Sequence, residues 1–291
     1  MYKVYLHLLK FIMKVYSLIF LLLFKCSCTN AQNIHVTAFA GLSNYQGDLQ
    51  SKKFTFNQAH TALGGGFIYE ITDNLFARLL FTYGQVSADD KKGKNTDRNL
   101  SFNSTIYEVQ LGAEYDLFNN YERALIPYAF MGIAVFNFNP TAEDKRGKTV
   151  ALQPLGTEGQ GFYLGRKKYA LTQLAIPFGG GLKLAINENV RIKGEIGLRY
   201  LFTDYLDDVS NTFADKTDLL INNGQLAVDM AFRGSEIKPT ATYPVASSKR
   251  GNPAIKDFYY VASIGISCRI NQKENTTYHG KAKYGCPTNI Y

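Results

Sequence analysis

Three histidines are the side chains best suited to acid–base chemistry in the body of this chain: His35, His60 and His279. Histidine titrates near neutral pH, so a histidine beside a serine could activate that serine for acyl transfer. His60 could serve a lipid acyl hydrolase or transferase in this way, but no Gly-x-Ser-x-Gly or comparable elbow accompanies it. The alternative is a solvated surface histidine. We predict a protein that is not an enzyme and has neither a catalytic residue nor a cofactor.

Three acids, Asp204, Asp207 and Asp208, stand close enough in the sequence to suggest an ion site. Carboxylate oxygens are the ligands that calcium prefers. The chain lacks the twelve-residue loop that orders such ligands, however. A hydrogen-bonded loop at the end of a strand is the alternative, and we predict no metal site.

The first 31 residues are typical of a secretory signal peptide. Lysines precede an apolar run at 15–24, and small residues end the segment at Ala31. The run is too short to be a membrane-spanning helix, which needs ~20 residues. Met13 begins a compact signal by itself and could be the true start.

Cleavage after the signal would leave 291 − 31 = 260 residues, and because the signal holds four lysines and no acid, the net charge would fall from +8 to +4. That charge does not favour nucleic acid as a partner. Cys26 and Cys28 would leave with the signal, since Lys25 makes a poor lipidation motif. Cys268 and Cys286 would remain, either as one disulfide or as two unpaired thiols.

Polarity alternates along eight segments that we predict to be strands. In the clearest of them, Ile192 and Ile196 alternate with Arg191 and Lys193. A soluble sheet with one wet face would explain this pattern, and so would a membrane barrel with lipid outside and charges in its lumen. The segments are 33–43, 61–72, 75–86, 100–117, 126–138, 175–186, 190–203 and 258–270.

The lengths and connections of these segments favour the membrane barrel. Strands in soluble proteins usually run five or six residues, whereas tilted membrane-crossing strands need ~9–11. Long and short connections alternate along the chain, as in outer-membrane barrels. We predict an all-β fold, an eight-stranded antiparallel transmembrane β-barrel over 32–270, with short periplasmic turns, long outer loops and a periplasmic tail at 271–291. Its location would be the outer membrane of a Gram-negative bacterium.

The polar faces of the strands would share one lumen, which a barrel of eight strands fills with side chains. We predict a salt-bridged plug and no pore, formed by Glu70, Arg78, Glu108, Glu114, Lys183, Arg191, Lys193, Glu195, Arg199 and Arg269. Segment 126–138 is apolar on both faces. Because Asn137 and Asn139 are polar, we expect its odd-numbered face to point into the lumen. The glycine runs 64–66 and 179–181 lack the context of a phosphate loop and indicate bends or close packing.

Six segments have unusually distinctive amino-acid sequences: 43–49, 99–102, 137–140, 154–161, 176–181 and 203–210. Together and in this order they resemble the PorG-type outer-membrane proteins of Bacteroidetes. The similarity covers nearly all of the chain beyond the signal. Its loop residues are Tyr45, Gly47, Asp48, Asn139, Pro140, Thr157, Glu158, Gly159, Gln160, Gly161, Asp204, Tyr205, Asp207 and Asp208.

The resemblance implies a non-enzymatic component of the type IX protein secretion system, which exports proteins bearing a C-terminal signal and supports gliding in some species. The implied partners are outer-membrane lipid and periplasmic ring proteins of the PorK and PorN type, with no nucleic acid and no small-molecule substrate. The alternatives are a generic structural or adhesive barrel of the OmpX or OmpA type and a lipid-modifying barrel enzyme.

The positions of these segments raise a difficulty, because most lie in outer loops while the implied ring is periplasmic. Contact with the ring would fall to the short turns, the 118–125 connection and the tail 271–291. The tail could dock on the ring or be disordered. It could also carry Cys286 back to Cys268.

Overall fold

The computed structural model describes residues 34–50, 55–92, 95–119, 123–187, 189–254 and 256–270. The predicted signal peptide and the predicted periplasmic tail lie outside these residues, and so do His279 and Cys286. What was expected of them stays a prediction.

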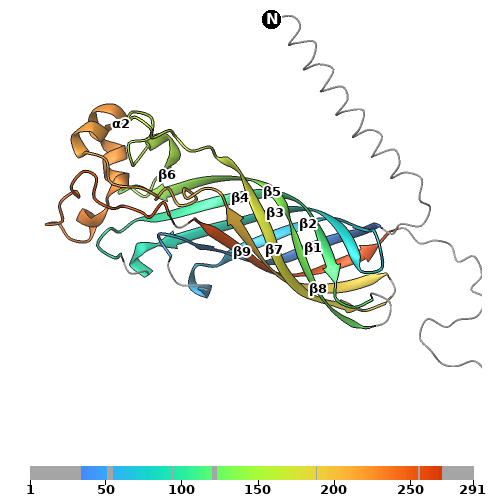
Figure 1. Cartoon of the computed structure of the whole chain (residues 1–291). Helices are drawn as coiled ribbons and strands as arrows, with labels where there is room; N and C mark the ends of the chain where they lie inside the picture. The colour runs from blue at the N-terminus through green and yellow to red at the C-terminus, as the bar shows by residue number, and fades with distance from the viewer. Residues whose placement is uncertain are drawn as a thin grey trace, which may run out of the picture.

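Eight long antiparallel strands close into one barrel (Figure 1). The strands pair in chain order, and the β1–β9 and β4–β5 pairings complete the ring. They are β1 (Ile34–Gln46), β2 (His60–Glu70), β3 (Leu75–Asp89), β4 (Ser101–Asp116), β5 (Leu125–Glu143), β7 (Thr172–Ala185), β8 (Val190–Leu201) and β9 (Phe258–Arg269). The predicted fold, an eight-stranded antiparallel β-barrel, is confirmed.

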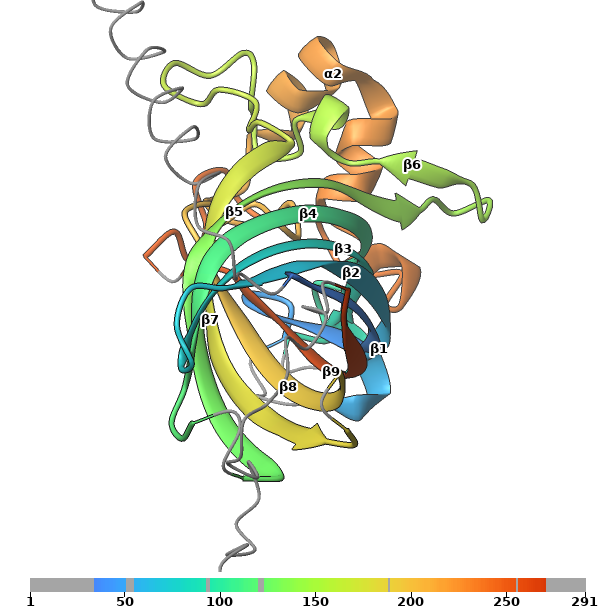
Figure 2. The same cartoon turned by 90° about the vertical axis from the view of Figure 1, so that its right-hand side faces the viewer.

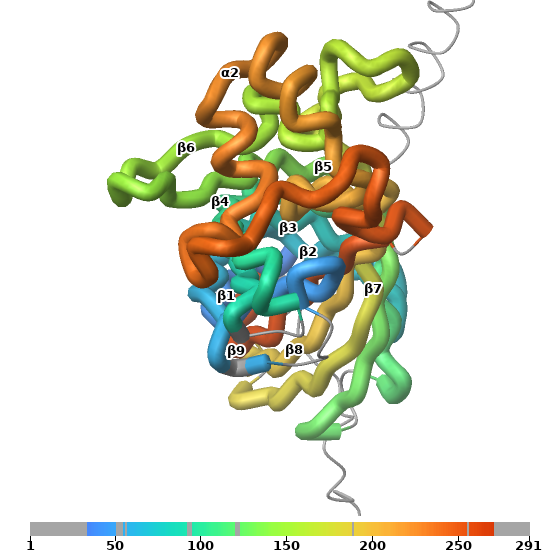
Figure 3. Tube along the Cα trace, turned by 90° about the vertical axis from the view of Figure 1, so that its left-hand side faces the viewer, coloured from blue at the N-terminus to red at the C-terminus, as the bar shows by residue number. Residues whose placement is uncertain are grey.

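The two ends of the barrel differ in what they carry. The turn end has the three short connections and also the start of β1 and the end of β9, where Ile270 N donates to Ile34 O at 2.8 Å. The loop end carries every long connection (Figure 3). These hold η1 (Phe56–Gln58), η2 (Asp90–Lys92), the short strand β6 (Thr149–Ala151), η3 (Gln153–Leu155), the helix α2 (Lys216–Ala231) and η4 (Gly234–Glu236).

The helix α2 lies beyond the loop end of the barrel, on the side of β5 and β6 (Figures 1 and 2). Asp215 caps its N-terminus by accepting hydrogen bonds from Thr217 N at 2.8 Å and Asp218 N at 3.1 Å. Gly224 interrupts it with φ 83°, a left-handed conformation that favours glycine, so the helix kinks there. Among the described residues, no helix is both long and apolar enough to cross a membrane.

The wall of the barrel is apolar outside and polar inside. On β8, Ile192 and Ile196 are exposed while Arg191 and Lys193 are buried, which confirms the predicted alternation. The exposed side chains form a belt that includes Phe67, Leu79, Phe81, Val109, Leu111, Met131, Ile133, Leu182, Ile196 and Ile264. A continuous apolar belt around a polar interior is the lipid-facing surface of a membrane barrel.

The face assigned to β5 from the sequence is wrong. Tyr128 and Phe130 point into the barrel and are buried, whereas Met131 and Ile133 are 62% and 65% exposed. The even-numbered face is therefore lumenal. Asn137 lies on the outside with the other odd-numbered residues.

The error has a physical cause, because β3, β4 and β5 continue beyond the lipid belt. Their register places Tyr83, Tyr107 and Asn137 in one row. Toward the turn end, the outward side chains are apolar and the inward ones mostly polar. Toward the loop end the pattern inverts: polar side chains face outward, while Phe102 and Phe138 are buried inside. Asn137 lies where the outward side chains change from apolar to polar, so its polarity does not show that it faces the lumen.

The glycine runs lie within β2 and β7, where strands and rings pack closely. A Cβ on Gly181 would lie 2.1 Å from Gly194 O and 2.8 Å from the ring of Tyr128. Only glycine fits such an approach. The expectation of close packing, and not of a phosphate loop, is confirmed.

Candidate functional site

Glu114 is the centre of the charged lumen. Its carboxylate lies 2.7 Å from Lys183 Nζ, 2.8 Å from Lys193 Nζ and 3.3 Å from Arg78 Nη1. The side chain is completely buried. Lys183 also reaches Asp116 at 2.6 Å. One carboxylate thus joins strands β3, β4, β7 and β8 across the interior, and it partly neutralises three cations that could not remain charged there alone.

Arg78 extends this network to the next acid. Its two terminal nitrogens each lie 2.9 Å from an oxygen of Glu195, the bidentate geometry that arginine favours with carboxylates. Tyr128 donates to the same carboxylate at 2.8 Å. The ring of Phe130 lies 4.0 Å from the guanidinium carbon and covers it. The inward aromatic side chains of β5, Tyr128 and Phe130, therefore contact the charged side chains that extend into the lumen from β8 and β3.

Two further ion pairs lie on either side of Glu114 along the barrel axis. Toward the loop end, Arg199 Nη2 lies 3.1 Å from Glu108. Toward the turn end, Arg269 lies 3.2 Å from Glu70, and His35 lies 3.6 Å from the same carboxylate. The structure places all ten charged residues expected in the lumen on the inner face: Glu70, Arg78, Glu108, Glu114, Lys183, Arg191, Lys193, Glu195, Arg199 and Arg269.

These side chains fill the lumen. Two cavities among them have volumes of about 20 and 10 Å³, room for about one water molecule each. Toward the loop end an apolar cluster follows, which includes Phe136, Phe138, Leu201 and Leu206. The interior is therefore occupied by charged side chains toward the turn end and by an apolar layer toward the loop end.

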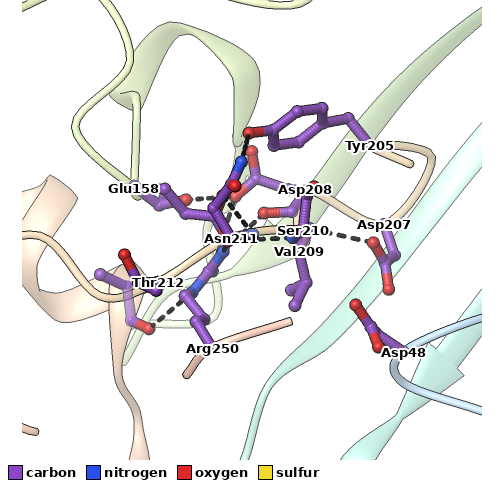
Figure 4. A network of polar contacts seen from close by, with 12 residues as sticks. Asp48, Glu158, Tyr205, Asp207, Asp208, Val209, Ser210, Asn211, Thr212 and Arg250 are labelled. Carbon is purple, nitrogen blue, oxygen red and sulfur yellow. Dashed lines mark hydrogen bonds and ion pairs between the residues drawn. The ribbon is translucent and has the colours of Figure 1, made fainter. Parts of the chain in front are cut away.

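We call the described residues of the long connections at the loop end the outer cap; they are 47–50, 55–59, 90–92, 95–100, 144–171, 202–254 and 256–257. Arg250 lies at its centre, buried, with Nη1 2.9 Å from Glu158 Oε1 (Figure 4). Glu158 also accepts hydrogen bonds from the backbone of Ser210 at 2.9 Å and Asn211 at 3.0 Å. Two long connections, 144–171 and 202–257, are joined at this point.

Asp208 is the second acid beside this arginine. Its carboxylate lies 3.6 Å from Arg250 Nη2, and it accepts hydrogen bonds from Thr157 at 2.6 Å and Tyr169 at 2.7 Å. The side chain is fully buried. Burial raises the pKa of Asp208 to about 6, although the charge of Arg250 opposes the shift.

Tyr45 joins the end of β1 to two more buried acids. Its hydroxyl lies 2.6 Å from Asp207 and 3.0 Å from Asp257. A phenol has one hydrogen, so it can donate to only one of them, and the other contact needs a proton on the carboxyl. Burial raises the pKa of both carboxyls well above the ordinary range, and for Asp257 the charge of Asp207 adds to the shift.

These raised pKa values predict that the cap becomes less stable as pH rises. Burial also raises the pKa of Asp204 to about 7. Acids whose pKa is higher in the folded than in the unfolded state hold protons that unfolding releases. Stability of the cap should therefore fall as pH rises from about 4 through about 7, by at most about 1.4 kcal/mol per pH unit for each group.

The measurement is amide hydrogen exchange in the segment 203–210 between pH 5 and pH 8, corrected for the intrinsic exchange rate. Protection should decrease with rising pH, and Asp204→Asn should flatten the slope. Protection that grows with pH would contradict the assignment of protonated acids.

Comparisons with known proteins give one family model and several solved structures that are similar to this chain. Residues 13–152 match the family model described as "Domain of unknown function (DUF6089)". The chain is similar to Neisserial surface protein A (NspA) at 12% identity, covering 83% of this chain and 100% of that one, with a TM-score of 0.42. It is also similar to Ail, the attachment invasion locus protein of Yersinia pestis, at 9% identity, 82% and 99% coverage and a TM-score of 0.39. No match was found among curated proteins.

The apolar belt around a charged, filled interior decides the class, since only a barrel embedded in lipid needs that arrangement. The protein is a small transmembrane β-barrel. Its belt lies between the turn end and the row of Tyr83 and Tyr107, and its outer cap stands beyond that row.

The cap of this barrel brings together many of the loop residues that the sequence resemblance singled out. Those in or beside the polar network are Tyr45, Asp48, Thr157, Glu158, Gln160, Asp204, Tyr205, Asp207 and Asp208. Gly47, Gly159 and Gly161 lie in the turns beside them, and Gly159 and Gly161 have positive φ. Asn139 faces outward and Pro140 lies inside on β5, both apart from this network.

Sequence reasoning missed several residues of the network. Arg250 and Asp257 lie in the long 202–257 connection, where no periodic pattern marks them, and Tyr169 precedes β7. Arg98 also went unnoticed; it pairs with Asp90 at 2.7 Å and donates to Arg250 O. A loop residue's partner is set by the fold and leaves no local signal.

The histidine proposed for acyl transfer, His60, does have a serine beside it. Its Nε2 lies 2.6 Å from Ser87 Oγ at the loop end of the barrel. Within the described part of the chain, no hydrogen bond from this ring to a carboxylate orients it, and no three acids, histidines or cysteines are arranged to hold a metal. Cys268 lies in β9, and its pairing with Cys286 stays a prediction.

Proposed function

We propose that this barrel is a non-enzymatic structural component of the outer membrane that serves the type IX protein secretion system of a Bacteroidetes-type bacterium. The observation that supports a structural role is the filled lumen. Side chains around Glu114 and the apolar layer above them occupy the interior, with cavities of about 20 and 10 Å³ among the charges. A barrel that carries no solute acts through its surfaces.

The secretion role is supported by the six segments that resemble PorG-type proteins. Several of them meet in one buried network of the cap, between Glu158, Asp208 and Tyr45. Residues that satisfy one another in this way specify one cap conformation. A specific cap is what a secretion component needs if other outer-membrane parts are to recognise it.

The proposed partners are periplasmic ring proteins of the PorK and PorN type. They would contact the turn end, where the short connections carry Asp73 and Arg123 and where both described ends of the chain lie. The barrel would thereby link the ring to the outer membrane. The lipid belt supplies the anchor, and the cap remains free on the other side.

The test is the fate of secreted proteins in a strain that lacks this chain. Proteins with the C-terminal export signal should accumulate in the periplasm while the outer membrane stays intact. Normal secretion would instead favour a generic structural or adhesive barrel, for which a fixed cap over a filled lumen is equally suitable.

A further inference from the structure

Three neighbouring strands carry an uncharged polar surface outside the barrel, just beyond the lipid belt. We call this surface the polar sheet face. It consists of six outward side chains of β3, β4 and β5 that lie in the row of Tyr83 and Tyr107 or beyond it: Gln85, Asn103, Thr105, Asn137, Asn139 and Thr141. All six are exposed or half-buried, and all are amides or hydroxyls.

The strand register makes this surface continuous. Gln85, Thr105 and Asn139 are Cα partners and form one row across the three strands. Asn103 and Thr141 are partners in the next row toward the loop end. Rows on one face are about 7 Å apart and neighbouring strands about 4.8 Å apart, so these groups form a flat, closely spaced array.

Most of the array has unused hydrogen-bonding capacity. Asn137 donates to Thr172 Oγ1 at 3.0 Å, and Thr141 donates to Asn103 O at 2.9 Å. The side chains of Gln85, Thr105 and Asn139 make no hydrogen bond with any described residue, and neither does the side-chain amide of Asn103. An Asn or Gln amide offers two donors and an acceptor, and a Thr hydroxyl offers both.

The position of the face indicates what it meets. Tyr83 and Tyr107, whose ring centroids are 5.4 Å apart, border it on the membrane side, and aromatic side chains lie at the interface of a membrane barrel. The face is therefore continuous with the lipid belt and level with the headgroups of the outer leaflet. None of its six side chains is a lysine or arginine, so the face itself offers no cation to a phosphate. Its far edge carries two acids, Asp89 and Glu143, and Arg233, which donates to Ser101 Oγ there at 3.4 Å.

We propose that the polar sheet face binds the uncharged sugars of outer-leaflet lipopolysaccharide. Sugar hydroxyls donate and accept hydrogen bonds, as the amides and hydroxyls of the face do. Tyr83 and Tyr107 provide apolar ring surface at its lower edge. The binding would hold a layer of glycolipid against one side of the barrel, independently of any secretion role.

The experiment compares two matched double variants of the full barrel in phosphatidylethanolamine vesicles. T105A/N139A removes two hydrogen-bonding side chains of the face, and T240A/N222A removes an exposed Thr and Asn of the outer cap. Each barrel is extracted from vesicles containing either complete lipopolysaccharide or lipid A alone, and native mass spectrometry counts the retained molecules. Since Thr105 is half-buried and the other altered side chains are exposed, both variants should fold, as circular dichroism would check.

The control variant should retain complete lipopolysaccharide as the parent barrel does, and T105A/N139A should retain about tenfold less. Lipid A alone should be retained weakly and equally by all three. Equal retention of complete lipopolysaccharide by the two variants would overturn the proposal. Retention of lipid A as strong as that of complete lipopolysaccharide would also overturn it, because phosphates and acyl chains would then be the ligand.

Discussion

Glu114→Leu should lower the free energy of unfolding of the barrel by about 3–5 kcal/mol, the usual cost of breaking a buried ion pair by removing one partner. The substitution leaves Lys183, Lys193 and Arg78 close together without the carboxylate that lies within 3.3 Å of each. Asp116 and Glu195 remain for two of the three cations, but Lys193 loses its ion-pair partner. Urea unfolding in lipid vesicles, followed by circular dichroism, measures the change.

Glu143→Leu is the matched control for this experiment. Glu143 is an exposed acid at the end of β5, and exposed substitutions usually change stability by less than about 0.5 kcal/mol. Adding Lys193→Met to Glu114→Leu should recover part of the loss, because the added change removes the cation left without an ion pair. Unchanged stability of Glu114→Leu would show that the lumen charges are solvated and do not hold the strands together.

Arg250→Met should unfold the outer cap while leaving the barrel closed. The substitution keeps an unbranched side chain of moderate size but removes the arginine that pairs with the buried carboxylates of Glu158 and Asp208, again a loss of about 3–5 kcal/mol. Because these acids join the 144–171 and 202–257 connections, the loss falls on the cap. Limited proteolysis of vesicles should then cut within 202–257, and the strands should remain protected.

Lys249→Met is the control for the cap, since Lys249 is the exposed neighbour of the buried arginine. It should resist the protease as the parent protein does. A cap that stays resistant in Arg250→Met would mean that its apolar contacts, such as those of Leu206 and Val209, hold it without the ion pairs.

The membrane part of the fold was predictable because lipid imposes a strict pattern on each strand. Every second residue must be apolar over the height of the belt, and β8 shows this between Arg191 and Arg199. The lumen charges followed from the same alternation. The face of β5 was predicted wrongly because the rule inverts where the wall leaves the membrane, and Asn137 lies at that point.

The cap was less predictable because its contacts join residues far apart in the sequence. Tyr45 meets Asp207 and Asp257, more than 160 residues away. The sequence resemblance singled out Tyr45 and Asp207 without showing that they touch. Asp257 and Arg250 carried no signal, since an isolated charge in a long loop is usually solvated.

The central claim is that this barrel serves protein secretion through its surfaces, and the location of cargo tests it most directly. In a strain lacking the chain, proteins with the C-terminal export signal should shift from the medium and cell surface to the periplasm, and the parent gene should restore them. A periplasmic enzyme should stay inside the cells, which shows that the outer membrane is intact. Cargo that reaches the outside in normal amounts would contradict the secretion role.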